Sequence, residues 1–298
     1  MSEQEEKTDN AIKERAAELQ KTAEVDDLEG EESAFVGCLT DHVQTAMDEV
    51  MTAHSTATRG GSDNESQYKS LNADQKRIVD KVVSAVCDEN QPIHLIVSGQ
   101  GGTGKSKVIS VLFHSVSENT IKSGGVPVVV AAPTGLAAYN IGGTTIHRLL
   151  SLPVEHGKPA NYSKLNQDQL KIIRGTLKHL QLLIVDKVSM VSSLMLLYIH
   201  TRLTGIMCDD TYFGGISVVF FADFLQLPQV KGNQPFVPVT FLEAKQRLGS
   251  VASLHKRVSM MIHSMQSCQL PSIRSNSVKW TSQGATTATS SDSGLRGT

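Results

Sequence analysis

The sequence predicts an α/β fold in which a parallel sheet carries helices on both faces. Short apolar or β-branched runs alternate along the chain with helical patterns, an order typical of parallel sheets. A glycine-rich loop follows the first of these runs and precedes a helical pattern, as phosphate-binding loops do. The composition, 40% hydrophobic and 19% charged over 298 residues, is that of a globular protein with one or two domains.

Hydrophobic periodicity gives the expected elements in order. A helix begins after Asn72, which is a suitable N-cap with Gln75 three residues later. The expected strands are residues 93–97, 126–132, 182–185 and 216–221. The other expected helices are residues 105–119, 167–180 and 190–204. Parallel sheets bind ligands at the carboxyl ends of their strands. Four candidate positions come just after strands: Gly99, Thr134, Asp186 and Asp223.

The glycine-rich loop fits the pattern G-x-x-x-x-G-K-[ST]. Its glycines let backbone N–H groups approach phosphate oxygens, Lys105 adds a positive charge for the β- and γ-phosphates, and Ser106 offers a hydroxyl to Mg²⁺. A plain surface turn is the alternative, but the preceding strand and the following helix favour phosphate binding. The expected nucleotide-binding residues are Gly99, Gly101, Gly102, Thr103, Gly104, Lys105 and Ser106.

The two ends of the chain differ from its middle. Residues 1–69 are expected to form an acidic, largely disordered arm with one amphipathic helix at 34–54. Apolar residues repeat every four positions on that helix, at Phe35, Leu39, Val43, Met47 and Met51. The ordered domain is expected at 70–254, and an irregular, low-complexity tail at 255–298.

Charge is distributed unevenly along the chain. Residues 1–68 carry 5 Lys and Arg against 17 Asp and Glu, whereas the remainder carries 23 against 13. A basic body suits a polyanionic partner such as nucleic acid. The acidic arm is either a solvated segment or a screen for the basic face. No apolar run approaches the roughly 18 residues of a membrane span, so no membrane partner is expected. The acidic start argues against a secretory signal or a mitochondrial presequence.

Four blocks of sequence occur in a characteristic order. They are Leu71–Gln75, Ala132–His147, Leu183–Val191 and Gly214–Pro228. Together they resemble the first motor lobe of the Pif-type, superfamily-one DNA helicases, which include copies carried by rolling-circle (Helitron-like) mobile elements. The resemblance covers about residues 70–250. It implies a P-loop NTPase of the RecA-like fold that uses ATP and Mg²⁺ and binds single-stranded DNA or DNA junctions. It leaves the oligomeric state open.

The resemblance also implies roles for single residues around the nucleotide. Gln75 matches the glutamine that reads the adenine, although its spacing from Asn72 also suits a helix cap. Lys105 and Ser106 match the phosphate and Mg²⁺ ligands. Asp186 matches the acid that holds Mg²⁺ through water, a role suited to a carboxylate at the end of a buried strand. Gln226 matches the γ-phosphate sensor.

Other positions of the resemblance concern DNA. Thr134, Gly135 and His147 match positions near single-stranded DNA, where a hydroxyl and free N–H groups can bind a phosphate and an imidazole can stack. Taken alone, His147 is equally suited to packing or capping. Asp223 is the neighbouring acid of the Gln226 motif and could serve only to shape the loop.

One departure from the family concerns catalysis. The family has Asp-Glu where this chain has Asp186 and Lys187. The glutamate positions and activates the attacking water, and a general base of this kind contributes about 10²–10⁴-fold. A protonated lysine has no acceptor for the proton, and it could pair with Asp186 in competition with Mg²⁺. The sequence therefore predicts weak or absent hydrolysis with nucleotide binding retained.

A second departure concerns extent. The resemblance ends after Leu254, before the family's second motor lobe with its arginine finger, so we expect the first lobe only. A truncated or frameshifted mobile-element copy would account for both Lys187 and the tail. The open alternatives are a working helicase, a non-catalytic ATP- and DNA-binding remnant or regulator, and an unrelated phosphate-loop ATPase or kinase. The family works in DNA repair, recombination and telomere maintenance, and the absent presequence favours the nucleus over the mitochondrion.

Overall fold

The computed structural model describes residues 40–56, 64–120, 125–154, 161–226, 233–235 and 237–248, and the backbone of 266–269. A six-stranded sheet lies at its centre, with the strands in the order β3-β2-β4-β5-β1-β6. Its strands are β1 (His94–Ser98), β2 (Val128–Ala132), β3 (Thr144–Thr145), β4 (Leu182–Val185), β5 (Ser217–Ala222) and β6 (Gln266–Gln269). Every pair is parallel, so the predicted parallel sheet is confirmed.

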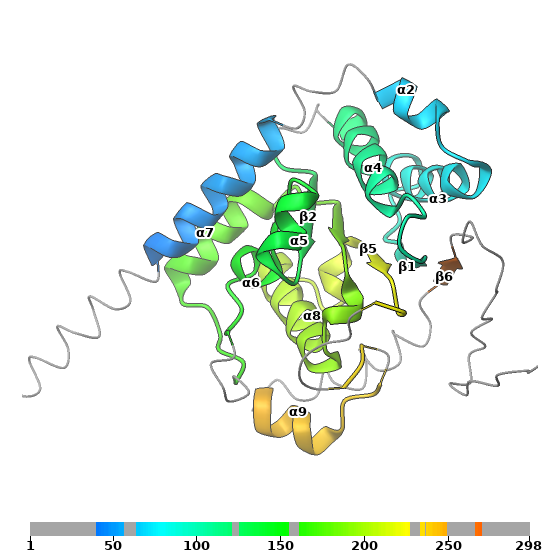
Figure 1. Ribbon diagram of the computed structural model, residues 1–298. Helices are drawn as coiled ribbons and strands as arrows, with labels where there is room; N and C mark the ends of the chain where they lie inside the picture. Colours follow the sequence, from blue (N-terminus) through cyan, green and yellow to red (C-terminus); the bar gives the residue numbers. More distant parts are fainter. Residues whose placement is uncertain are drawn as a thin grey trace, which may run out of the picture.

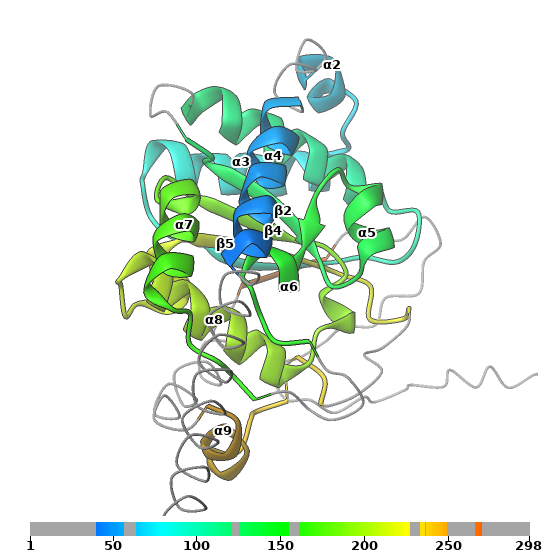
Figure 2. The ribbon, with the colours of Figure 1, turned by 90° about the vertical axis from the view of Figure 1, so that its left-hand side faces the viewer.

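Helices cover both faces of the sheet (Figures 1 and 2). The longer helices are α3 (Ala73–Val83), α4 (Lys105–Thr120), α7 (Gln167–Leu177) and α8 (Ser193–Met207). Shorter ones are α2 (Asn64–Lys69), α5 (Gly135–Asn140), α6 (Ile146–Leu149) and α9 (Phe241–Leu248). Strands β2, β4 and β5 are buried along their whole length, as expected for a parallel sheet that is covered on both sides.

Two core clusters show how the faces are divided. Alternate strand residues point to opposite faces, and Val128 and Val130 pack in one cluster with residues of α3 and α4. Val129 and Ala131 pack in the other cluster with residues of α7, α8 and a helix at 40–56. The predicted arrangement, with helices on both faces, is therefore confirmed.

The helix at 40–56 is part of the core. We expected an amphipathic helix at 34–54 with a repeat of four; Phe35 and Leu39 lie outside the described residues. The buried face consists of Val43, Ala46, Met47 and Val50, because 3.6 residues per turn place positions i, i+3, i+4 and i+7 on one side. Met51 is 46% exposed, so its predicted place on this face is wrong. The helix adds to the core cluster that contains α7 and α8.

Helix boundaries differ from the periodicity where caps determine them. Helix α8 starts at Ser193 because the Ser192 side chain accepts a hydrogen bond from the Met195 N–H at its first turn. The predicted start at Met190 falls in a short 3₁₀ turn, η4 (Val188–Met190). Helix α7 ends at Leu177, three residues before its predicted end.

The sheet also contains two strands that the sequence did not predict. Strand β3 has two residues and pairs with the end of β2. Strand β6 pairs with β1 and lies in the segment expected to be an irregular tail, so for residues 266–269 that expectation is wrong. Both are edge strands of the sheet, where short strands are common.

Candidate functional site

The phosphate loop connects β1 to α4 at the carboxyl edge of the sheet. Gly102 and Gly104 have φ of +79° and +81°, a left-handed conformation that favours glycine. At Gly104 a Cβ would also lie 2.5 Å from Nε2 of Gln75, so that flexible side chain would have to move to make room for it. Thr103 is buried, and its hydroxyl donates to the Gln100 carbonyl at 2.8 Å. The loop therefore has the conformation that its glycines predict.

Gln75 joins this loop to the start of α3. Its Oε1 accepts from the Asn72 N–H at 2.9 Å, while its own N–H donates to Asn72 Oδ1 at 2.9 Å. This reciprocal pair is the predicted capping box. The same side chain donates from Nε2 to the Thr103 carbonyl at 2.9 Å. The capping role is thus observed, and the adenine role stays a prediction.

Lys105 lies at the centre of the site. Its Nζ donates to the carbonyls of Gly99 at 2.7 Å and Gln100 at 2.9 Å and lies 3.7 Å from Oδ2 of Asp223. Burial lowers the pKa of Lys105, and the negative charges of Asp223 and Asp186 oppose that shift. A cation held in this way by loop carbonyls can exchange them for phosphate oxygens.

Asp223 has a larger part in the site than sequence reasoning assigned to it. It is buried, and its Oδ1 accepts from the Leu225 N–H at 3.1 Å while Oδ2 faces Lys105. Strand β5 is a direct neighbour of β1 in the sheet, whereas β4 is not. The acid that ends β5 therefore reaches the loop lysine. Its position after a buried strand was the available signal.

Gln226 lies next to the same loop. Its backbone N–H donates to the Asp223 carbonyl at 3.1 Å. A Cβ built on Gly101 would lie 3.2 Å from the Gln226 side-chain nitrogen, so the amide is in contact range of the loop. The structure thus brings Gln226 to the phosphate loop, and its role as a γ-phosphate sensor stays a prediction.

Asp186 ends β4 and is buried. Its N–H donates to the Ala131 carbonyl at 2.9 Å. Burial raises the pKa of Asp186, while a hydrogen bond from the Lys187 N–H and the charges of Lys105 and Lys187 act in the opposite direction. In the described parts of the chain no ion pair joins Lys187 to Asp186 within 4.0 Å. The contact between the two residues is through the Lys187 backbone.

Lys187 has an unusual backbone conformation. Its φ of 54° and ψ of 42° are left-handed, which costs a side-chain-bearing residue roughly 1 kcal/mol or more. The side chain is half-buried, and its charge acts on both Lys105 and Asp186. A second cation therefore stands beside the loop lysine.

The chemistry of these donors fits a nucleotide with a hard cation. Ser106 is exposed at the first turn of α4 and offers a hydroxyl, and Asp186 offers a carboxylate. Mg²⁺ takes such oxygen donors and completes its octahedron with water and phosphate oxygens. No cluster of three or more His, Cys, Asp or Glu residues occurs among the described side chains, and a site of this type does not need one.

The predicted DNA residues follow β2 and β3, two paired strands of the sheet. Ala132 and Thr145 are partners in register, so the segments that follow them begin at the same edge of the sheet. The Thr134 hydroxyl caps α5 by accepting from the Ala137 N–H at 3.3 Å. Gly135 is exposed and a Cβ there would meet nothing within 4 Å. His147 is half-buried on α6.

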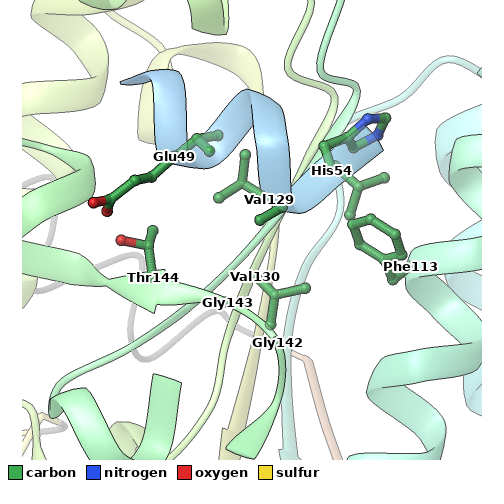
Figure 3. Close-up of a pocket in the computed structure, with 11 residues that line it drawn as sticks. Glu49, His54, Phe113, Val129, Val130, Gly142, Gly143 and Thr144 are labelled. Atoms are coloured by element: carbon green, nitrogen blue, oxygen red, sulfur yellow. The ribbon is translucent and has the colours of Figure 1, made fainter. Parts of the chain in front are cut away.

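One pocket lies between the helix at 40–56 and the β2–β3 strands (Figure 3). It has a volume of about 120 Å³. Glu49 and Thr144 lie at one end, and His54 and Phe113 at the other. The sequence did not indicate this pocket, because it depends on where the helix at 40–56 packs. Among the described helices, none has the length and apolarity needed to cross a membrane.

Comparison with known proteins identifies relatives. The sequence pattern of the PIF1-like helicases matches residues 70–267, and it extends past Leu254, where we expected the resemblance to end. The ATP-dependent DNA helicase PIF1 of Candida albicans is 32% identical over 161 residues, 54% of this chain and 16% of that protein. The ATP-dependent DNA helicase RRM3 of Saccharomyces cerevisiae is 30% identical over 160 residues, 54% of this chain and 21% of that protein.

A solved structure is also similar. The crystal structure of Pif1 helicase from Candida albicans has 25% sequence identity and a TM-score of 0.49, over 68% of this chain and 40% of that chain.

This chain spans only about a fifth or less of the length of the two curated relatives. The family match covers 198 of its 298 residues. On this basis the chain belongs to the PIF1-like helicase family.

Proposed function

We propose that residues 70–267, the extent of the family match, form the nucleotide-binding motor lobe of a Pif-type ATP-dependent DNA helicase, with the hydrolysis step impaired at Lys187. The observation that carries the proposal is the convergence at one sheet edge of the phosphate loop, Asp186, Asp223 and Gln226. Relatives 30–32% identical to this chain are ATP-dependent DNA helicases, which supports ATP as the nucleotide and DNA as the partner.

The loop binds the phosphates of ATP in this proposal. Lys105 Nζ leaves the carbonyls of Gly99 and Gln100, which it contacts at 2.7 and 2.9 Å, and donates to phosphate oxygens. Asp223 remains its counter-ion. Ser106 and Asp186 would hold Mg²⁺, and the bound ion would neutralise negative charge on the phosphates. In this proposal Gln75 recognises the adenine in addition to capping α3.

Hydrolysis lacks its base. The residue after Asp186 must orient water and accept its proton, and the Lys187 side chain can only donate. Its positive charge also acts on Lys105. Two neighbouring positive charges favour an anionic ligand in the site. The lobe therefore binds ATP but hydrolyses it slowly or not at all. Loss of a general base lowers the rate by about 10²–10⁴-fold.

DNA binds beside the nucleotide in this proposal. Thr134, Gly135 and His147 follow β2 and β3, and β2 lies next to the strand that ends in Asp186. Single-stranded DNA or the single-stranded part of a junction suits a surface with hydroxyl, N–H and imidazole groups. A role in DNA repair or recombination in the nucleus is part of the same proposal.

A non-catalytic role is the second candidate, and Lys187 favours it. A lobe that binds ATP and DNA without turnover acts as a regulator or is a remnant of an active enzyme. It differs from the first candidate only in the rate of hydrolysis. Nucleotide binding with no response to DNA would instead count against the DNA-binding part of both candidates.

The test compares three proteins: this chain, Lys187→Glu and Lys187→Gln. We expect all three to bind a fluorescent ATP analogue with Mg²⁺, and only Lys187→Glu to hydrolyse ATP, faster by about 10²–10⁴-fold and with stimulation by single-stranded DNA. The glutamine variant is the matched control, because it removes the positive charge without supplying a base. DNA-stimulated turnover by the unaltered chain would contradict the impairment, and absent nucleotide binding would contradict the proposal as a whole.

A further inference from the structure

An ion pair joins the helix at 40–56 to α6 beside the proposed DNA surface. The Arg148 guanidinium lies 2.7 Å from the Glu49 carboxylate, and the two side chains are 48% and 50% exposed. Arg148 comes directly after His147 in the same short helix. A strong positive donor therefore lies one residue along the helix from a proposed DNA contact, and its guanidinium is paired with an acidic side chain.

The local sequence determines where Arg148 lies. Gly143 contacts the Val130 carbonyl so closely that no side chain fits there, and this contact brings Thr144 and Thr145 alongside β2. The Thr145 hydroxyl then accepts from the Arg148 N–H at 3.3 Å and caps α6. The backbone of Arg148 is therefore fixed relative to the sheet.

Glu49 is fixed from the other side. Val43, Met47 and Val50 of its helix are at most 5% exposed and pack in the core cluster. Glu49 is not part of a movable lid, because its helix is anchored in that core. The pocket of about 120 Å³ extends beneath the helix from Glu49 and Thr144 (Figure 3). The carboxylate keeps access to solvent, so Arg148 can exchange partners without rearrangement of the fold.

We propose that Arg148 binds a phosphate of single-stranded DNA and that Glu49 competes with this phosphate for the same guanidinium. This inference rests on the proposed DNA surface at Thr134, Gly135 and His147. A guanidinium binds a carboxylate and a phosphate through the same fork of N–H groups. A half-exposed pair contributes little to stability, so a polyanion can replace the carboxylate. Glu49 thereby sets the affinity of the lobe for DNA.

The experiment measures binding of a labelled oligothymidylate to the full chain by fluorescence anisotropy, between about 50 and 200 mM salt. We expect Glu49→Gln to tighten binding about two- to fivefold and Arg148→Gln to weaken it by a similar factor. Arg148→Gln should also reduce the slope of log affinity against log salt by about 0.7, the value for one phosphate on a single strand. The double variant should bind like Arg148→Gln alone.

Asp48→Asn is the matched control. Asp48 is an exposed acid next to Glu49 and accepts from Gln44 at 2.9 Å, not from Arg148. An effect equal to that of Glu49→Gln would indicate a general field and would overturn the inference. The inference also fails if Glu49→Gln still tightens binding when Arg148 is glutamine. If His147→Ala weakens binding while Arg148→Gln does not, the proposed DNA surface stands and Arg148 has no part in it. If the unaltered chain binds no oligothymidylate, both proposals fail.

Discussion

Two ion pairs lie beside the proposed sites: one is longer and buried, and the other is shorter and half-exposed. Lys105 and Asp223 are 3.7 Å apart, with side chains only 14% and 5% exposed. Arg148 and Glu49 are 2.7 Å apart, with side chains about half exposed. Removal of one partner should cost more in the longer pair, because it leaves a buried charge without its counter-ion, whereas water screens the exposed charges. The distance between two charges does not by itself determine how much an ion pair matters for stability. We expect the phosphate-loop region to depend on its ion pair and the α6 region not to depend on its own.

The largest expected effect breaks the buried pair. Asp223→Asn keeps an acceptor for the Leu225 N–H but removes the counter-ion of Lys105. Removal of one partner of a buried pair costs about 3–5 kcal/mol, and urea unfolding measures the loss in the free energy of unfolding. A loss below about 0.5 kcal/mol would place this pair with exposed ones and remove the contrast.

The loop glycine gives the next effect. Gly104→Ala places a side chain at φ +81° and 2.5 Å from Gln75 Nε2, with an expected loss of about 1–3 kcal/mol and weaker nucleotide binding. The matched control is Gly175→Ala, in α7, where a Cβ meets nothing within 4 Å. That change should stabilise the protein by about 0.5–1 kcal/mol. Thermal unfolding of both variants decides, and equal losses would contradict the prediction.

Two capping boxes of the same composition separate stability from binding. Asn72 caps α3 and Asn166 caps α7, each with a glutamine three residues later. Changing either asparagine to alanine should cost about 1 kcal/mol of unfolding free energy. Only Asn72→Ala should also weaken binding of the ATP analogue, because its partner Gln75 supports the loop. Equal binding by the two variants would show that the loop does not depend on the cap.

The smallest effect concerns the exposed pair. Arg148→Gln should lower the unfolding free energy by at most about 1 kcal/mol, and the difference should vanish near 1 M salt, where screening is strong. Asp223→Asn measured under the same conditions should keep most of its effect. If the two variants respond to salt alike, burial does not distinguish the pairs.

The sequence predicted well what depends on neighbours along the chain. Strand β4 was predicted residue for residue, and the capping box at Asn72 follows from local spacing. The partnership of Lys105 with Asp223 could not be predicted, because it requires knowing that β1 lies beside β5. The same holds for the helix at 40–56, whose acidic surroundings in the sequence concealed its place in the core.

The site was predicted to a similar extent. Gln226 lies next to the phosphate loop and the charge of Asp186 acts on Lys105. The roles of all the predicted site residues toward ligands stay predictions. The left-handed backbone at Lys187 had no signal in the sequence. Such a conformation depends on the 3₁₀ turn that follows it, and periodicity predicted an ordinary helix in that region.

The position of the Gln75 side chain suggests a way to measure whether the phosphate loop is occupied. One amide group closes the cap of α3 through the Asn72 N–H and holds the phosphate loop through the Thr103 carbonyl. A shift of the loop around a ligand is therefore expected to strain the hydrogen bond between Gln75 and the Asn72 N–H. The exchange of the Asn72 amide proton with solvent becomes a gauge of loop occupancy, readable at a position outside the loop itself.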